Sequence, residues 1–385
     1  MRRVLALAGS IVFVDTLFFA ALTPLLPTYA DRFDLSKAGA GLLAAAYPLG
    51  VLAGGIPSGL LAARAGIKAT AVTALGLIAA TSVVFGYGDS IALLDTARFL
   101  QGIGSACAWT AALTWLVSVA PAGRRGELIG AALGVAIAGA LFGPVAGAIA
   151  SIAGTGPVFS VIGGLCVLVA IVALRTAAPP VGEERQPLRG LVEALRDRRI
   201  VGGLWLVALP ALLFGTQSVL VPIRLSSFSY GAVAIGAVFL VATALEGVMS
   251  PVVGRVSDRR GRRLPITVGL TASSIAAAAL PVPRNGLTLA AVAVFAAVSF
   301  GMFWAPAMSF LTETAESIGL DVAWAFALIN LAWAPGQALG AVGGGGLARL
   351  TSDAVPFLLL SGVCVATLVA VRRERRPVAV VRSQA

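Results

Sequence analysis

The sequence predicts an all-α membrane protein with about twelve transmembrane helices in two pseudo-symmetric six-helix bundles. Of its 385 residues, 58% are hydrophobic and only 12% are charged, and the mean hydropathy is +0.96. Such a composition excludes an ordinary soluble core. Apolar stretches long enough to cross a bilayer recur along the whole chain. A basic ten-residue segment, Gly59–Lys68, also returns in similar form at Gly254–Arg263, which indicates a duplication.

The expected spans divide into two sets of six around one polar segment. They are residues 5–29, 37–63, 67–88, 91–119, 127–153, 157–175, 200–222, 231–256, 265–282, 287–312, 322–348 and 354–371. We therefore predict an N-terminal bundle (1–175), a cytoplasmic linker (176–199), a C-terminal bundle (200–371) and a basic cytoplasmic tail (372–385). Leu188, Leu191, Val192 and Leu195 have helical spacing in the linker, which predicts an amphipathic interfacial helix.

The distribution of Arg and Lys predicts the orientation. If both termini are cytoplasmic, the outside carries only Arg32, Lys37, Arg224, Arg284 and Arg349, and nearly all other basic residues lie inside. The first span is too long for a signal peptide and lacks a small-residue cleavage site, so we expect it to be retained. The multi-pass chain is expected in a plasma membrane, and its Arg-rich composition favours a bacterial inner membrane. The net charge of +11 is then explained by topology and lipid headgroups, without nucleic acid.

Several kinds of chemistry are excluded by composition. The chain has no histidine, and Cys107, Cys166 and Cys364 all fall inside expected spans. We therefore expect no disulfide framework, no metal site and no cofactor, and we do not expect an enzyme. The expected partners are a small-molecule substrate, protons and membrane lipids, and the chain is expected to be a monomer.

Charged residues inside the spans are the sharpest functional signal, because each costs about 2.5–3.5 kcal/mol on insertion scales. Asp15 lies near the middle of the first span, Glu246 lies deep in the eighth, and Arg98 lies in the fourth. The carboxyls could carry protons or could only bond a neighbouring helix. Arg98 could supply a fixed positive charge to a nearby acid, or it could form a structural ion pair with Asp95.

A substrate surface is expected along the eleventh span, where aromatic and amide side chains share one helix face. This face carries Phe326, Asn330, Trp333 and Gln337. Residues on other spans are expected to complete the surface: Phe18, Gln101, Phe214, Gln217, Thr243 and Phe303. Aromatic stripes in membrane helices also serve packing and lipid contact, so both interpretations stay open.

Glycines in the fifth span recur every four residues at Gly139, Gly143 and Gly147, with Pro144 among them. Such a face allows close approach of a neighbouring helix and forms a flexible seam. The residues predicted to act in conformational change are this set and the two basic turns: Gly59, Arg64, Gly66, Gly139, Gly143, Pro144, Gly147, Gly254, Asp258, Arg259 and Gly261.

These motifs resemble those of the major facilitator superfamily, and within it the twelve-helix drug/proton antiporter family. The resemblance covers almost the whole chain. It is carried by the two basic turns and by Leu22–Pro27, Leu94–Gly104 and Gly130–Gly147, each in the expected span. The resemblance implies a proton-coupled antiporter, with a role for Arg98 in proton exchange.

One departure from the family pattern concerns the basic turns. An Asp precedes the Arg in the family motif; the second copy keeps it as Asp258, but the first has Ala63 there. The resemblance implies that this Asp latches the cytoplasmic side against a helix N-terminus. Only one of the two latches is therefore expected.

Together these features predict a proton-coupled exporter of a small amphipathic, cationic compound that works by alternating access. The alternatives are an exporter of a neutral metabolite, such as a sugar or amino-acid derivative, and a membrane sensor that transports nothing.

Overall fold

The computed structural model of the chain consists of long helices. It describes residues 1–121, 125–178, 193–320 and 322–373, and the side chains of residues 125–127, 258, 322, 323 and 326 lie outside the described part. In chain order the helices are α1 (Arg2–Arg32), α2 (Lys37–Tyr87), α3 (Ile91–Ser118), α4 (Arg125–Ala153), α5 (Thr155–Arg175), α7 (Arg198–Ser227), α8 (Ala232–Arg260), α9 (Arg263–Ala279), α10 (Gly286–Gly301), α11 (Trp304–Ser317), α12 (Val322–Leu350) and α13 (Ala354–Arg373). Eight helical stretches in the described residues are long and apolar enough to cross a membrane.

The helices coincide with the expected spans, with two differences. α2 comprises the second and third spans, which meet without an intervening loop at a kink at Gly66, where φ is 84° and ψ is 165°. The tenth expected span is divided into α10 and α11 at Met302 and Phe303. Pro306 accounts for this break, because it has no N–H to donate to residue 302 and its ring excludes a continuous helix there.

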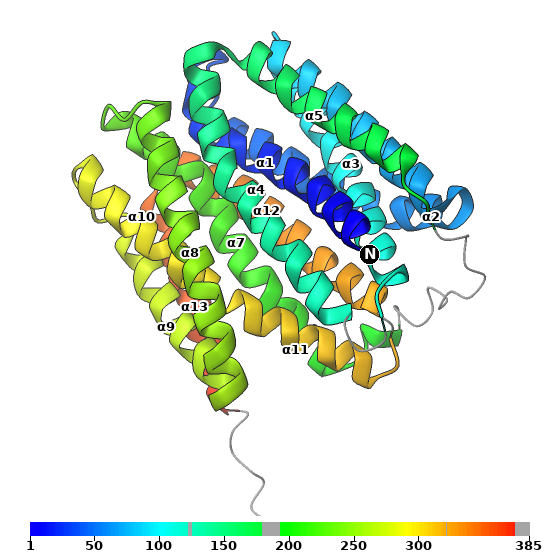
Figure 1. The fold of residues 1–385 in the computed structure, drawn as a ribbon. Coiled ribbons are helices and arrows are strands. Elements are labelled where there is room, and N and C mark those ends of the chain that lie inside the picture. Colours follow the sequence, from blue (N-terminus) through cyan, green and yellow to red (C-terminus); the bar gives the residue numbers. More distant parts are fainter. Residues whose placement is uncertain (122–124, 179–192, 321, 374–385) are drawn as a thin grey trace, which may run out of the picture.

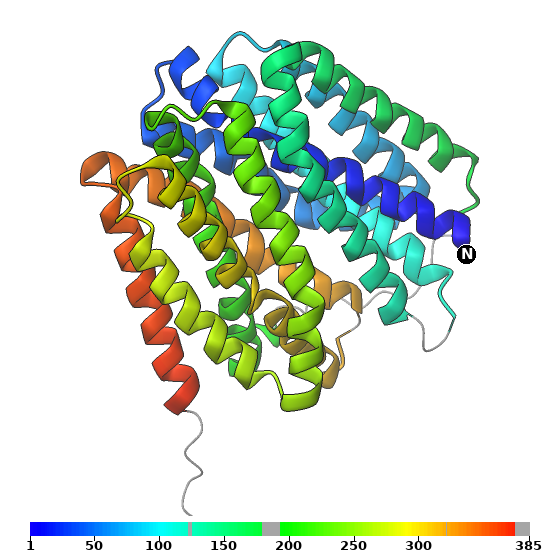
Figure 2. The same cartoon turned by 60° about the vertical axis from the view of Figure 1, so that its left-hand side comes forward.

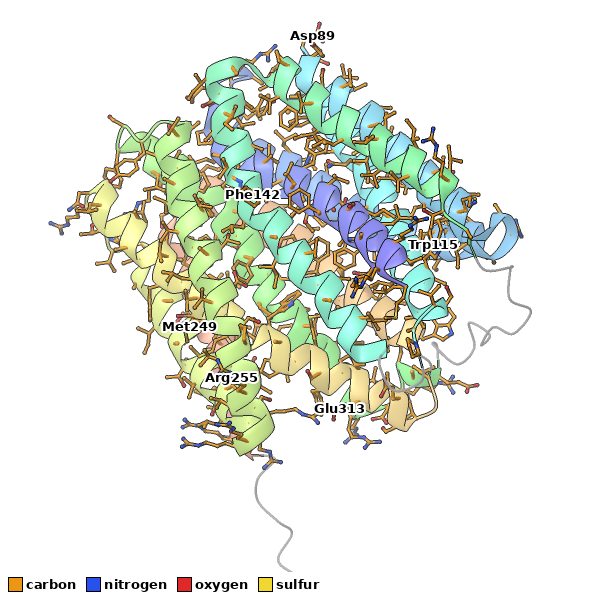
Figure 3. The ribbon with its side chains drawn as sticks, viewed as in Figure 1. Asp89, Trp115, Phe142, Met249, Arg255 and Glu313 are labelled. Carbon is orange, nitrogen blue, oxygen red and sulfur yellow. The ribbon has the colours of Figure 1, made fainter. Side chains whose placement is uncertain are left out.

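Most of the expected linker helix, residues 179–192, lies outside the described residues. The described helices form two bundles, α1–α5 and α7–α13 (Figures 1 and 2). One end of the molecule carries Arg255 and Glu313, and Asp89 lies at the other end (Figure 3). We call the first the basic end, since Arg64, Lys68, Arg175 and the arginines that flank Gly261 are also there, and the second the distal end.

Glycine-backed seams hold each bundle together. In the N-terminal bundle, Gly139, Gly143 and Gly147 of α4 lie directly against the backbone of α1. In the C-terminal bundle, Gly336, Gly340 and Gly344 of α12 lie in the same way against α7. Thr16 Oγ1 donates to the carbonyl of Ala136 at 2.9 Å in the first seam, and Thr216 Oγ1 donates to that of Gly340 at 2.9 Å in the second. The two seams are copies of one helix interface.

The two bundles contact each other closely at the distal end. Gly41 of α2 packs against the backbone of Ala341 in α12, and Gly345 of α12 packs against the carbonyl of Lys37. The matching contact joins α8 to α4, where a Cβ on Gly236 would lie 2.9 Å from the carbonyl oxygen of Pro144. Gly41 precedes Gly59 by the same interval as Gly236 precedes Gly254, so these contacts are also related by the duplication.

Toward the basic end the same helix faces are uncovered. On α2, the face that carries Gly41 continues to Leu52 (39% exposed) and Ile56 (62% exposed). On α12, the face that carries Ala341 continues to Asn330, which is exposed. The halves are thus packed at the distal end and apart near the basic end.

Candidate functional site

Asp15 is fully buried (0% exposed) at the level where the two bundles part. Its carboxylate accepts hydrogen bonds from Ser105 Oγ (2.7 Å) and Trp109 Nε1 (3.0 Å) of α3. The hydroxyl of Tyr47 from α2 lies 3.1 and 3.0 Å from its two oxygens. These donors hold the carboxyl in one orientation and compensate for its removal from water.

The Tyr47 hydroxyl is also 2.7 Å from Ser105 Oγ. A phenol has a single proton to donate but its oxygen also accepts, so Tyr47 can donate to Asp15 while it accepts from Ser105, or it can donate to Ser105 instead. The group Asp15–Tyr47–Ser105 can therefore change its hydrogen bonding without any movement of the backbone. Trp109 is only half-buried and lies between this group and the surface near the basic end.

Arg98 is also buried (1% exposed), about two turns of α3 before Ser105. Its Nη1 donates to Gln101 Oε1 at 2.9 Å, and its Nη2 is 3.5 Å from the carbonyl of Phe19. The guanidinium lies over the rings of four residues, at 5.1 Å from Tyr47, 5.7 Å from Phe18, and 5.9 Å from Phe19 and Phe85. Aromatic faces stabilise a desolvated cation, and this accounts for a buried arginine without a carboxylate in contact.

The structural ion pair between Arg98 and Asp95, which was the alternative interpretation of Arg98, is not formed. Among the described side chains, no carboxylate oxygen lies within 4.0 Å of a nitrogen of Arg98. The buried Oδ1 of Asp95 has no hydrogen-bond partner. Arg98 is directed instead toward Tyr47, which bonds Asp15, so the ring of Tyr47 connects the buried cation with the buried carboxylate.

Glu246 has different surroundings. It is half-buried on α8 and makes no hydrogen bond or ion pair with a described residue. Its side chain packs over Gly301, where a Cβ would come within 2.6 Å of Glu246 Cγ and 2.7 Å of Cδ. Glu246 thus lies beside the break between α10 and α11.

On the predicted substrate face of α12, exposure falls from Asn330 to Gln337. Asn330 is exposed, Trp333 is half-buried, and Gln337 is only 7% exposed. The ring of Trp333 meets Phe19 at a centroid distance of 5.9 Å, and Phe19 meets Tyr47 at 4.7 Å. This contact between the bundles closes the exposed surface immediately beside the Asp15 cluster.

Other predicted substrate residues are placed differently. Phe18 (1% exposed) packs against Phe85 and Phe159 inside the N-terminal bundle, and Phe303 (0% exposed) belongs to the C-terminal core. These two are therefore packing residues in this conformation, because neighbouring helices cover them on every side. Gln101 (0% exposed) is buried as the partner of Arg98.

In the C-terminal bundle, Gln217 donates from Nε2 to the carbonyl of Ala293 at 2.9 Å, while its buried Oε1 has no partner. Phe214 and Thr243 are half-buried, and Phe214 packs edge-on against Phe300 at 5.7 Å. The side chain of Phe326 lies outside the described part.

The predicted conformational residues fall into two groups. Gly66 and Gly261 form the two basic turns with positive φ, Gly139, Gly143 and Gly147 form the α4 seam, and the carbonyl of Pro144 faces Gly236 of α8. Gly59 and Gly254 are half-buried near the basic end, and Arg64 and Arg259 are exposed. The side chain of Asp258, on which the predicted latch depends, is outside the described part.

Sequence reasoning missed Tyr47, Ser105 and Trp109. A signal for two of them was present in the fourth span, because Arg98, Gln101, Ser105 and Trp109 follow one another at spacings of three, four and four, which place them on one helix face. No pattern in the second span connects Tyr47 with Asp15, because only the packing of α1 on α2 joins them.

Comparisons with known proteins agree with this architecture. The sequence profile described as Major Facilitator Superfamily matches residues 8–336. The synaptic vesicular amine transporter of Bos taurus is 27% identical over 304 residues, which are 76% of this chain and 57% of that protein. A probable sugar efflux transporter of Helicobacter acinonychis is 25% identical over 269 residues, 68% of each chain.

Two solved structures share the fold over nearly the whole chain. The nucleoside transporter NupG has a TM-score of 0.76 at 12% identity and covers 97% of this chain and 100% of its own. The xylose transporter XylE from E. coli has a TM-score of 0.73 at 15% identity and covers 97% and 98%.

Proposed function

Because the chain belongs to the Major Facilitator Superfamily and is a transporter, we propose that it exports a small amphipathic cation in exchange for protons. The observation that carries this proposal is the buried Asp15 carboxylate, which accepts bonds from Ser105 and Trp109 beside an uncovered, partly aromatic surface. A carboxylate in that position attracts either a proton or an organic cation, and the two compete for one charge.

The way in which the two halves meet supports alternating access. The orientation expected from the arginines places the basic end in the cytoplasm, so the separation of the halves at that end gives access from inside. Export requires this end to close and the distal contacts of Gly41 and Gly236 to separate. One proton that moves down about 150 mV releases about 3.5 kcal/mol, enough for a gradient of about 300-fold.

The similarity to the amine transporter supports a cationic substrate, as does the bond from Trp109 to Asp15. Trp333 adds a further ring nearby, because it contacts Phe19, which packs on Tyr47. The second candidate is export of a neutral metabolite, in which the carboxyls serve protons only. The exposed amide of Asn330, the unpartnered Oε1 of Gln217 and the similarity to a sugar efflux transporter favour it.

Purified protein in proteoliposomes with an internal pH dye tests the proposal. An outward substrate gradient should drive protons inward, and lipophilic cations should compete with each other for that flux. Flux that sugars inhibit and lipophilic cations leave unchanged would favour the neutral substrate. If labelled test compounds cross the liposome membrane but none of them drives proton movement, proton coupling is contradicted. Asp15→Asn should abolish the flux, and Glu313→Gln, which removes an exposed carboxyl at the basic end, is its matched control.

A further inference from the structure

The basic end of the C-terminal half carries an arginine cluster that the transport proposal does not use. It consists of Arg255, Arg259 and Arg260 at the end of α8, Arg262 and Arg263 at the start of α9, and Arg372 and Arg373 at the end of α13. Apart from Arg262, which pairs with Glu313, none of these side chains forms an ion pair with a described carboxylate. All of them except Arg262 are exposed.

The packing of α9 on α13 brings two of these arginines together. The helices touch at Ser274 and Ser361, whose hydroxyl oxygens are 3.1 Å apart, and Ser361 Oγ donates to the carbonyl of Ser274 at 2.9 Å. Arg263 lies eleven residues before Ser274, and Arg372 lies eleven residues after Ser361. Eleven residues make about three helical turns and rise about 16 Å, so the two arginines return to the facing sides of the helices at one level.

Two guanidinium groups at neighbouring positions repel each other unless an anion lies between them. Next to them, the outer faces of both helices are apolar and exposed. They carry Leu264 (38% exposed), Val268 (46%) and Ile275 (59%) on α9 and Val365 (46%) and Val369 (41%) on α13. A ligand with an anionic head and a long apolar body fits both parts of this surface.

We propose that the surface formed by Arg263, Arg372 and the apolar faces of α9 and α13 binds one anionic phospholipid. Its headgroup phosphate bridges the two guanidinium groups, and its acyl chains lie along the exposed valines and leucine. A planar guanidinium group can bind a phosphate through two parallel N–H···O hydrogen bonds. Arginines at the cytoplasmic surface also attract anionic lipids.

The duplicated turn in the N-terminal half provides an internal comparison. The positions that match Arg255, Arg260 and Arg262 there are Leu60, Ala65 and Ile67. Lys68, which matches Arg263, donates to the carbonyl of Leu174 at the end of α5 at 3.1 Å and so already has a partner. The positive-inside rule explains why both turns are basic. It does not explain why the turn at residues 254–263 carries five basic residues and the turn at residues 59–68 only two.

Lipid binding to the purified full-length protein tests the proposal. Phosphatidylglycerol, with phosphatidylcholine as the neutral comparison, is added in detergent, and the retained lipids are counted by native mass spectrometry. The double variant Arg263→Gln, Arg372→Gln should bind the first phosphatidylglycerol molecule about tenfold more weakly than the wild type. The double variant Lys68→Gln, Arg175→Gln removes the same charge from the same place in the other half. It should change the affinity for the first phosphatidylglycerol molecule by less than about twofold.

Equal losses in the two double variants would show a diffuse electrostatic effect and would overturn the proposal, as would no loss in either. A transplant provides a test that does not depend on the folding of the loss variants. Leu60→Arg with Ala65→Arg, both at exposed positions, should increase the retention of phosphatidylglycerol and leave that of phosphatidylcholine unchanged. If the transplant increases both equally, the effect is not one of headgroup charge and the proposal is wrong.

Discussion

Gly66 and Gly261 hold the same place in the two halves, and their backbone angles are nearly equal, with φ 84° and ψ 165° at the first and φ 78° and ψ 154° at the second. Both positive φ values suit only glycine without strain. The seams that join α4 to α1 and α12 to α7 also repeat, as do the distal contacts of Gly41 and Gly236. The duplicated features are therefore features of the backbone.

The polar groups are not duplicated. Asp15 is bonded by side chains of α2 and α3, and Arg98 lies close by within an aromatic box. Glu246 has no partner among the described residues and lies beside a broken helix. Close helix contacts thus place glycines in both halves, whereas the fully buried charged groups with hydrogen-bond partners, Asp15 and Arg98, lie in the N-terminal half.

The strongest test of this asymmetry compares Asp15→Asn with Glu246→Gln. Hydrogen bonds to a charged group contribute about 1.5–3 kcal/mol, so loss of the Asp15 charge should lower substrate-driven proton flux by at least about tenfold. Glu246→Gln should lower it by less than about threefold, because no described partner depends on that charge. Both variants should express near wild-type levels. Wild-type proton flux in the Asp15 variant would show that this residue does not take part in the mechanism. Equal losses of flux in the two variants would show that the two halves do not differ in this respect.

Arg98→Lys tests the fixed charge in the N-terminal half. Lysine keeps the charge but loses the planar group that lies over four rings, a contact of about 2 kcal/mol when desolvated. Active efflux in proteoliposomes should fall about tenfold more than counterflow exchange of labelled substrate. The companion variant Asp95→Asn should cost less than about 1 kcal/mol in thermal unfolding, since no ion pair is lost. If Asp95→Asn destabilises the protein as much as Arg98→Ala does, the two residues form a structural ion pair after all.

The duplicated distal contacts can be tested against each other. A Cβ at Gly41 would collide with the carbonyl of Ala341, and overpacking of this kind costs about 1–3 kcal/mol. Gly41→Val should therefore shift the protein toward opening at the distal end by about fivefold or more. Gly236→Val should act in the same direction, more weakly, since its nearest neighbour is 2.9 Å away.

Spin labels at Asp89→Cys and Arg284→Cys, both exposed near the distal end, would report the distance between the halves. The native cysteines are buried, so they should react slowly with the label. A distance distribution that neither substitution changes would mean that the glycine contacts do not control opening.

The smallest expected effect concerns an ion pair at one distal contact between the halves that has no counterpart at the other distal contact. Lys37 Nζ of α2 lies 2.5 Å from Asp353 Oδ1, between α12 and α13, and it joins the halves at the distal end. The position that matches Lys37 in the other half is Ala232. Partly exposed pairs contribute about 0.2–1 kcal/mol, so Lys37→Gln should increase distal opening by up to about fivefold.

The same pair of spin labels measures this change, and the exchanged pair Lys37→Asp with Asp353→Lys should restore the wild-type distribution. Arg262→Gln breaks an ion pair whose partners both lie in the C-terminal half, so it serves as the control and should change nothing. A shift in the control as large as that of Lys37→Gln would show that surface charge in general, rather than this contact, sets the balance.

The sequence by itself determined the class, the spans and the duplication. Length, hydropathy and the two basic turns are local properties, and hydrogen bonding within each helix makes a span recognisable without its neighbours. The glycine spacing in α4 also predicted close packing. It was equally clear from the sequence that Asp15, Arg98 and Glu246 are rare charges in apolar surroundings.

Tertiary structure alone decided what each of those charges touches. Arg98 and Asp95 stand at ion-pair spacing on one helix, yet the rotation of α3 directs Arg98 toward α1 and α2, and Asp95 is left without a partner. Tyr47 reaches Asp15 because α2 packs beside α1, and Phe18 is covered because α5 closes the bundle over it. These outcomes depend on helix rotation and on neighbours distant in the chain, and helical periodicity specifies only which residues share a face, not which helix that face meets.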